Sequence, residues 1–339
     1  MIYHEVSAGT ALADSGAVMS DNEIDKLIAS GLTFHESGEV EAARDCYLKV
    51  LELDPRNSQA LDFAALVCLP RGEFAAAKEF YKSAIEVDPD NPRFLLHLGI
   101  LFLDQDDLGA SEEVLNQVLE LDPDNADARF YLALGMRATD RREDAKEMLE
   151  TACSLDRENA NYQKWLGLVF METGDLVTAL EFTKTSLELN QKDVTAYVQL
   201  GAILKALEDL ELAEKALRSG LEIEIEDIRC RAELSGALME LGRLEDAKKE
   251  LDYIIDKDGK EHPSALSNLA LLETINGSGK LASELAQKAM EMDVKSIDVL
   301  LTAHKVFTNL DDKEKIDKIL ESIQGIAPDD ARVLNLLFA

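Results

Sequence analysis

The sequence is poor in the residues that build disulfide frameworks and zinc sites. Its four cysteines lie far apart and include no Cys-x-x-Cys pair: Cys46, Cys68, Cys153 and Cys230. Structural zinc sites and disulfide scaffolds need cysteines at close or regular spacings. We therefore expect neither, and we expect Cys68, which follows an apolar run, to be a core residue.

Basic residues are also scarce. The chain has 67 Asp and Glu residues against 35 Lys and Arg residues, a formal net charge of −32. A field of this sign repels phosphate backbones and anionic lipid surfaces, so we expect no nucleic-acid partner and no membrane insertion. The acidic surface is either a solvated face that keeps the protein dissolved, which we favour, or a docking site for a basic partner.

Long apolar runs are missing. The longest stretch almost free of charge, Phe94 to Leu103, is too short to cross a bilayer. No Lys or Arg precedes Lys26, so the first residues do not resemble a secretory signal. We expect a soluble, cytoplasmic protein whose residues 1–23, which mix small and acidic types without a period, form a flexible tail.

No catalytic or cofactor pattern is found. His4-Glu5 and His35-Glu36 lack the second histidine of a zinc-protease helix. Gly277-Ser278-Gly279-Lys280 resembles the end of a phosphate loop, but Leu281 stands where the Mg²⁺-binding Ser or Thr belongs. We expect no catalytic residue, no metal, no cofactor and no enzyme activity.

A period of 34 residues runs through most of the chain. Pro55, Pro89 and Pro123 each stand inside a Leu/Val-Asp-Pro-x-Asn phrase. Numbering each repeat from Ile24, Ser58 and so on, positions 8 and 20 are small in the first eight repeats: Gly31, Ala65, Gly99, Ala133, Gly167, Gly201, Ser235 and Ala270, then Ala43, Ala77, Ser111, Ala145, Ala179, Ala213, Ala247 and Ala282. Two positions that avoid bulk predict two helices that cross closely within each repeat.

The period also predicts where the helix pairs begin and end. Proline cannot continue the second helix of a repeat, and the Asn or Asp after it can cap the next helix. The expected repeats are 24–57, 58–91, 92–125, 126–159, 160–193, 194–227, 228–261, 263–296 and 297–330. The ninth is degenerate because His304 and Ile316 replace the small residues. Residues 331–339 are expected to form a short apolar helix that caps the last repeat or begins a tenth.

The pattern resembles the tetratricopeptide repeat (TPR) family. Between the two small positions, position 11 carries a large residue, as in Phe34, Phe102, Met136 and Phe170. The TPR pattern has Leu-Gly, an aromatic, Ala, an aromatic and Pro on a 34-residue helix–turn–helix period. The resemblance covers 24–330. It implies an all-α, right-handed superhelix of about nine repeats, and a non-catalytic protein-interaction scaffold.

The resemblance also implies a binding groove. In TPR proteins the first helix of each repeat lines it through positions 2, 5, 9 and 12, which in repeats three to five are Arg93, Leu96, Ile100, Leu103, Phe130, Leu134, Arg137, Lys164, Leu168 and Met171. The clamp that holds chaperone C-termini is absent, since Ile28 and Leu32 occupy its Lys and Asn positions. We expect a protein or peptide partner, an amphipathic helix or extended apolar segment with some acidic character. Position 9 also packs against the next repeat, so a purely structural role for these residues is equally consistent.

Two alternatives belong to other functional classes. The apolar C-terminal residues could dock on a second copy of the chain, which would make the protein a self-assembly module and a homo-oligomer: Val333, Leu334, Leu336, Leu337 and Phe338. The chain could also be a non-catalytic accessory subunit of an enzyme complex. The sequence names no partner.

Overall fold

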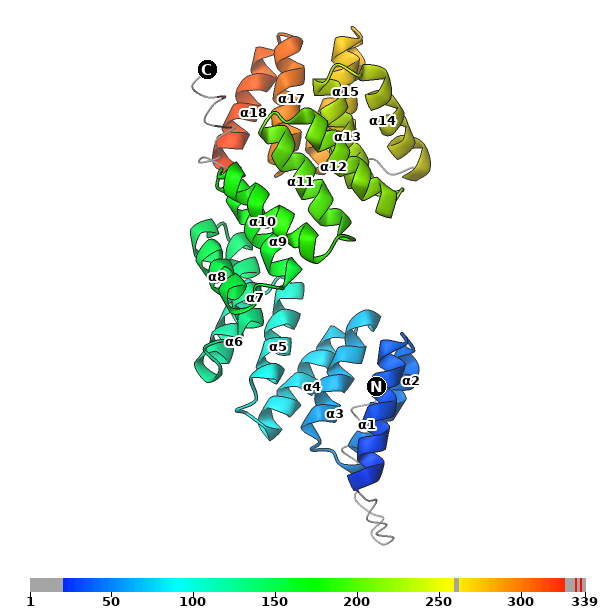
Figure 1. The fold of residues 1–339 in the computed structure, drawn as a ribbon, viewed down its shortest axis with the longest axis vertical. Coiled ribbons are helices and arrows are strands. Elements are labelled where there is room, and N and C mark those ends of the chain that lie inside the picture. Colours follow the sequence, from blue (N-terminus) through cyan, green and yellow to red (C-terminus); the bar gives the residue numbers. More distant parts are fainter. Residues whose placement is uncertain (1–20, 259–261, 327–332, 334–335, 337–339) are drawn as a thin grey trace. The chain divides into compact units, whose positions relative to one another are not determined.

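The structure is a computed structural model that describes residues 21–258, 262–326, 333 and 336. The regular structure of these residues is entirely helical, without a strand among them, and the helices follow one another in pairs joined by turns (Figure 1). The chain has the all-α TPR fold that the 34-residue period predicts. Residues 1–20 of the expected tail and most of the expected C-terminal helix 331–339 lie outside the described residues.

The helices form nine pairs within the described part of the chain. They are α1 (Asp21–Glu36), α2 (Val40–Leu53), α3 (Ser58–Cys68), α4 (Phe74–Val87), α5 (Pro92–Asp104), α6 (Leu108–Leu121), α7 (Ala126–Ala138), α8 (Arg142–Leu155), α9 (Ala160–Glu172), α10 (Leu176–Leu189), α11 (Val194–Ala206), α12 (Leu210–Ile223), α13 (Ile228–Glu240), α14 (Leu244–Asp258), α15 (Pro263–Ile275), α16 (Gly279–Met292), α17 (Ile297–Asn309) and α18 (Lys313–Ile326). A 3₁₀ turn, η1 (Leu69–Arg71), follows α3. Helix α1 begins three residues before the expected boundary at Ile24, and Glu23 in its first turn suits the positive end of a helix.

The chain divides into two compact bodies. The first body is Met1–Tyr131 and the second is Leu132–Ala339, so the boundary falls inside α7. Each body is an array of helix pairs in which each pair packs on the next along the chain.

The Asp-Pro-x-Asn phrase ends one repeat and begins the next. In three successive repeats the asparagine amide donates to the aspartate three residues earlier: Asn57 to Asp54 (3.4 Å), Asn91 to Asp88 (3.2 Å) and Asn125 to Asp122 (2.9 Å). The same asparagines accept a hydrogen bond from the first turn of the following helix. One side chain therefore closes the turn and caps the helix.

The turn inside each helix pair has one left-handed residue, always at position 15. In five repeats this residue is glycine, with φ from 72° to 87°: Gly38, Gly72, Gly174, Gly242 and Gly277. In the other four it carries a side chain, with φ from 55° to 64°: Asp106, Asp140, Glu208 and Asp311. The left-handed residue ends the first helix and lets the chain reverse, as in helix C-caps generally. The turn conformation is thus the same whether or not glycine is present.

The small residues of positions 8 and 20 lie where the two helices of a pair meet. A Cβ atom added to Gly99 would lie 2.6 Å from Cδ2 of Leu115, and one added to Gly201 would lie 2.5 Å from Cγ of Leu217. Both distances are too short for carbon atoms. The expectation that these positions exclude bulk because the helices cross closely is confirmed for these pairs.

The last repeat packs in the same way despite its degenerate sequence. Ala303, one residue before His304, is fully buried beside Phe307, Ile319 and Ile323. Val333, one of the two described residues of 331–339, is helical and belongs to the same apolar cluster. A buried alanine next to the expected position therefore supplies the small contact.

Candidate peptide-binding face

The residues predicted to line a groove lie on the first helices of their repeats. In the first body, α5 carries Arg93, Leu96, Ile100 and Leu103, and α7 carries Phe130. In the second body, α7 carries Leu134 and Arg137, and α9 carries Lys164, Leu168 and Met171. Positions 5, 9 and 12 of a helix share one side because they are four and three residues apart. Within each body, the predicted residues are thus placed on a common side of their helix.

In the first body this side is apolar and partly exposed. Its members are large aliphatic residues on α1, α3 and α5 or in the turn after α3, and each is intermediate in exposure: Leu32, Leu66, Leu69, Leu96, Ile100 and Leu103. We call this set the leucine-rich face. The three helices lie close together, because residues of α1 and α3 share one apolar cluster and residues of α3 and α5 share another. The face is therefore shared by neighbouring helices of one body.

A buried carboxylate lies between α3 and α5. Asp62 has 0% of its surface exposed, and its Oδ1 lies 2.6 Å from Nδ1 of His97. Nη2 of Arg93 lies 2.9 Å from Oδ2 in an ion pair that lacks the alignment of a hydrogen bond. The Arg93 guanidinium also lies over the Phe63 ring, 5.1 Å from its centre. A buried carboxylate needs such partners, so this contact fixes the two helices against each other.

Tyr81 lies beside this cluster. Its ring is 5.8 Å from the His97 ring, and its buried hydroxyl has no hydrogen-bond partner among the described residues. Burial raises the pKa of the Tyr81 hydroxyl well above its ordinary value, and the charge of Asp62 adds to this effect. The cluster thus places one negative charge and one neutral phenol under the surface, with the Arg93 side chain, 47% exposed, above them.

The other two predicted cations are also paired. Nε and Nη2 of Arg137 donate to the Glu172 carboxylate at 2.9 Å and 2.6 Å, and the guanidinium lies 5.4 Å from the centre of the Trp165 ring. Nζ of Lys164 donates to Oδ2 of Asp193 at 2.8 Å. Each of the three cations is therefore neutralised by a carboxylate of the same body.

Asp193 is also the N-cap residue of α11. It accepts hydrogen bonds from the backbone amides of Thr195 and Ala196. Partial burial opposes ionisation of this carboxyl, but the hydrogen bonds from Lys164, Thr195 and Ala196 outweigh it and hold its pKa below the ordinary value. The Lys164 ammonium is thus part of a helix cap, which leaves it poorly suited to select an acidic partner.

Phe130 differs from the rest of the predicted set because it is only 3% exposed. Its ring meets the ring of Tyr131 edge-on, with centres 5.1 Å apart, and Tyr131 takes the partly exposed place. Burying the larger apolar surface stabilises the fold more than burying a phenol would. Phe130 is therefore a core residue, and its assignment to a binding surface is corrected.

Sequence reasoning missed three residues of this region. Asp62, His97 and Tyr131 were absent from the predicted set, although Phe63, His97 and Tyr131 occupy the same position of successive repeats. An aromatic or imidazole ring recurring every 34 residues on the first helix could have indicated them. Burial raises the pKa of Tyr131, and the charges of Asp127 and Asp104 add to it, so these carboxylates lie close to the face.

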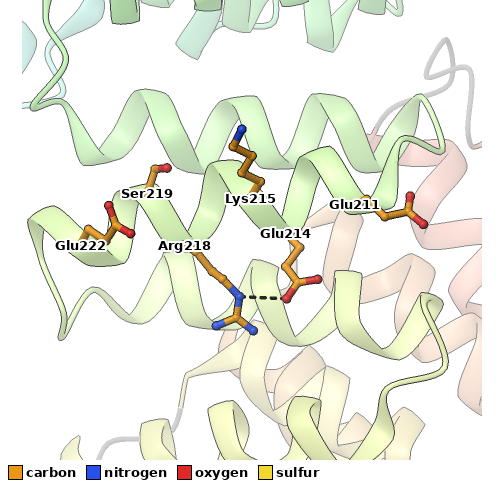
Figure 2. Close-up of a pocket in the computed structure, with 6 residues that line it drawn as sticks. All are labelled: Glu211, Glu214, Lys215, Arg218, Ser219 and Glu222. Atoms are coloured by element: carbon orange, nitrogen blue, oxygen red, sulfur yellow. Dashed lines mark hydrogen bonds and ion pairs between the residues drawn. The ribbon is translucent and has the colours of Figure 1, made fainter.

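One shallow hollow lies on the surface of α12. Figure 2 shows its six lining side chains, all from this helix: Glu211, Glu214, Lys215, Arg218, Ser219 and Glu222. Glu214 accepts from Arg218 at 2.8 Å and from Arg243 of the next repeat at 2.7 Å. Partial burial opposes ionisation of Glu214, but these two hydrogen bonds outweigh it and lower its pKa. Side chains that all project from one helix form a solvated surface, and the described residues here do not converge on a point where a ligand could be held.

A second hollow lies at the turn that resembles a phosphate loop. It is lined by Gly277, Ser278, Gly279, Lys280, Leu281 and Glu284. The Lys280 side chain is 93% exposed and lies 3.9 Å from Glu284, and the turn follows a helix instead of a strand. The glycine at position 277 is the left-handed residue that every repeat has at this point. The glycines of this motif thus belong to the ordinary turn of the repeat.

Within the described residues, no group of three or more His, Cys, Asp or Glu side chains is placed to hold a metal ion. No helix found in that part of the chain has the length and apolar character of a membrane span.

Comparison with known proteins agrees with the fold. Residues 7–237 match the family of the C-terminal domain of cilia and flagella-associated protein 70, a TPR domain. A search of curated proteins finds no match. Among similar solved structures, the APC/C hetero-tetramer Cut9–Hcn1 has a TM-score of 0.62 and 17% identity, and the match covers 83% of this chain and 55% of that one. A tetratricopeptide repeat protein from Parabacteroides merdae has a TM-score of 0.60 and 15% identity, with 74% of this chain and 98% of that one covered. PilF from Pseudomonas aeruginosa has a TM-score of 0.56 and 21% identity, with 62% of this chain and 96% of that one covered. At these identities the likeness shows the fold alone.

Proposed function

The chain belongs to the family of the C-terminal domain of cilia and flagella-associated protein 70, and from that premise we propose that it binds a helical or extended segment of a protein partner on the leucine-rich face. TPR domains are protein-interaction scaffolds, and the family is generally without catalysis. The face is built on packed helices, so it needs little ordering when a flexible segment binds.

The observation that carries this proposal is the exposure of the leucine-rich face. A helix that only packs against its neighbours has one apolar side buried and one polar side exposed. In α5, however, apolar residues occupy the buried side and also Leu96, Ile100 and Leu103, which stay partly exposed. A shared apolar surface across several helices is typical of an interaction site.

Self-assembly through the C-terminal segment is the less favoured alternative. Val333 is fully buried in the apolar cluster of the last repeat of its own chain, with Phe307 and Ile323. A residue in that position is not available to a second copy unless it leaves its own repeat. This contact supports a capping role for the segment.

Partner capture by matched variants tests the proposal. The test variant carries Leu66→Asp and Ile100→Asp, both on the leucine-rich face, and the control carries Val177→Asp and Leu212→Asp, which are 64% and 53% exposed on second helices. All three proteins are used as bait in native lysate after their melting temperatures have been compared. Loss of bound proteins from the test variant alone supports the proposal, and equal recovery by all three contradicts it.

A further inference from the structure

The charge around the leucine-rich face is negative at one edge. Glu36 is the last residue of α1 and Asp104 is the last residue of α5, and both stand at position 13 of their repeats. Both side chains are exposed, and neither makes an ion pair or hydrogen bond with the described residues. The two helices run in the same direction, so both carboxylates lie at the same edge of the face.

Both carboxylates stand where a helix itself disfavours them. The C-terminal end of a helix carries partial negative charge, so an acidic residue there is repelled and a cation is favoured. The neighbouring cations do not relieve this repulsion. Arg71, in the turn that follows α3, is paired with Glu41 and Glu73, and the ammonium of Lys78 lies over the Phe102 ring, 4.4 Å from its centre.

The cation nearest the opposite edge is also neutralised. Arg93 pairs with the buried carboxylate of Asp62, and that carboxylate cannot move away because it is fixed between α3 and α5. The expectation of a partner with acidic character rests on Arg93, Arg137 and Lys164. With Arg93 paired, the charge at this edge of the leucine-rich face is that of Glu36 and Asp104.

We propose that the segment bound on the leucine-rich face is a basic amphipathic helix, with aliphatic residues against the face and lysine or arginine over Glu36 and Asp104. This inference rests on the proposed function and specifies its partner. Each cation of the partner helix lies over one carboxylate and over the negative C-terminal end of the helix that carries it. The apolar side of the partner helix covers Leu66, Leu69 and Ile100.

The spacing of the repeats sets the spacing of the cations. Packed helices lie about 8–10 Å apart, so α1 and α5, separated by α3, place Glu36 and Asp104 roughly 20 Å apart. A helix rises 1.5 Å and turns about 100° per residue, so cations about 14 residues apart are roughly 21 Å apart and lie on nearly the same side of the bound segment.

Synthetic peptides of about 18 residues, long enough to span this distance, test the proposal on the full chain. The first has leucines at helical spacing and lysines about 14 residues apart; the second replaces these lysines by glutamates; the third keeps the composition of the first in scrambled order. Binding is measured by fluorescence anisotropy at low and high salt. The protein variants are Glu36→Gln with Asp104→Asn, and a control of equal charge, Glu86→Gln with Glu120→Gln, on the exposed surface of second helices in the same body.

The expected result is binding of the first peptide only, weaker at high salt. Glu36→Gln with Asp104→Asn should weaken it about three- to tenfold, the effect of two exposed ion pairs, while the control pair leaves it within about twofold. Equal binding of the glutamate peptide, or equal weakening by both variant pairs, overturns the charge assignment.

Two further outcomes separate this inference from the proposed function. If Ile100→Asp abolishes binding of lysine and glutamate peptides alike, the face binds peptides but does not select basic ones. That result overturns the inference and leaves the proposed function intact. If no peptide binds, the inference is overturned, and partner capture by the Leu66→Asp and Ile100→Asp variant decides the proposed function independently.

Discussion

Nδ1 of His97 lies 2.6 Å from Oδ1 of Asp62, so the first helices of two neighbouring repeats are joined through a carboxylate that has no exposed surface. Arg93 adds the second partner of this carboxylate. Other ion pairs join repeats of the first body, such as Arg71 with Glu41, but the carboxylate of this contact is fully buried. Its position at the side of the leucine-rich face connects the stability of the array to the proposed binding surface.

Removing one partner of the buried Asp62 carboxylate should destabilise the folded protein. We expect His97→Leu to lower the free energy of unfolding by about 2–4 kcal/mol, because it leaves a buried charge with one partner fewer. The double variant Asp62→Asn with His97→Leu should be less destabilised than the sum of the two single variants. Chemical denaturation of the four proteins gives this coupling as a double-mutant cycle. Strict additivity would show that the contact contributes nothing.

The left-handed residue at position 15 of each repeat predicts the effect of glycine substitutions. Glu208 has φ of 64°, a conformation that costs a residue with a side chain about 1–2 kcal/mol. We expect Glu208→Gly to raise the free energy of unfolding by about 0.5–1 kcal/mol after the added freedom of the unfolded chain is counted. Gly174→Ala, at φ of 87°, should lower it by about 1–2 kcal/mol. Shifts of the same sign in the two variants would contradict the turn assignment.

The helix crossings predict opposite results at two other glycines. A Cβ on Gly201 would lie 2.5 Å from Leu217, whereas a Cβ on Gly109 would meet nothing within 4 Å. Gly201→Ala should therefore destabilise by about 1–3 kcal/mol through overpacking. Gly109→Ala, in helix α6, should be neutral or stabilise by up to about 1 kcal/mol. Melting temperatures of the two variants check this, and Ala145→Leu should behave like Gly201→Ala.

The Lys164–Asp193 pair predicts how stability depends on pH. The pKa of the Asp193 carboxyl is lower in the folded chain than in the unfolded chain, so its stabilising contribution is complete above the unfolded value of about 3.9 and is lost as the pH falls through the folded value. Asp193→Asn keeps a side chain that can cap α11 but removes the charge. We expect it to be about 1–2 kcal/mol less stable than the wild type at pH 7.

The measurement is chemical denaturation of wild type and Asp193→Asn at several pH values. The difference between them should shrink as the pH falls below about 4, since the carboxyl of the unfolded wild type then becomes protonated and that of the folded wild type follows at lower pH. A difference that is constant with pH would mean that the substitution acts through geometry alone.

Much of the fold could be predicted from the sequence because the same residue types recur at the same positions in successive repeats. The small residues at positions 8 and 20 are where helices cross, and the Asp-Pro-x-Asn phrase is where one pair ends and the next begins. The turn residues were harder, since Asp106 and Glu208 take a glycine-like conformation that their own propensity opposes. The left-handed conformation is imposed by the packing of the two helices of the pair, which cannot be read from a single sequence.

The register of the repeats is enough to place the candidate face on the first helices, but the pairing of its cations could not be predicted from register. Register alone places Leu96, Ile100 and Leu103 on one side of a helix. The pairing of Arg93 with Asp62 depends on which side chains meet across two helices 31 residues apart in sequence. Likewise, register alone could not decide that Phe130 is buried while Tyr131, its neighbour, stays partly exposed.

The proposed binding of a protein segment on the leucine-rich face of the first body can be measured by crosslinking. A photoreactive amino acid placed at Ile100 in the full chain, and in a separate protein at Val177 on α10, tests it directly in native lysate after irradiation. We expect a covalent adduct with a partner protein from position 100 and none from position 177. Adducts from position 177 alone, or the same adducts from both positions, would contradict it.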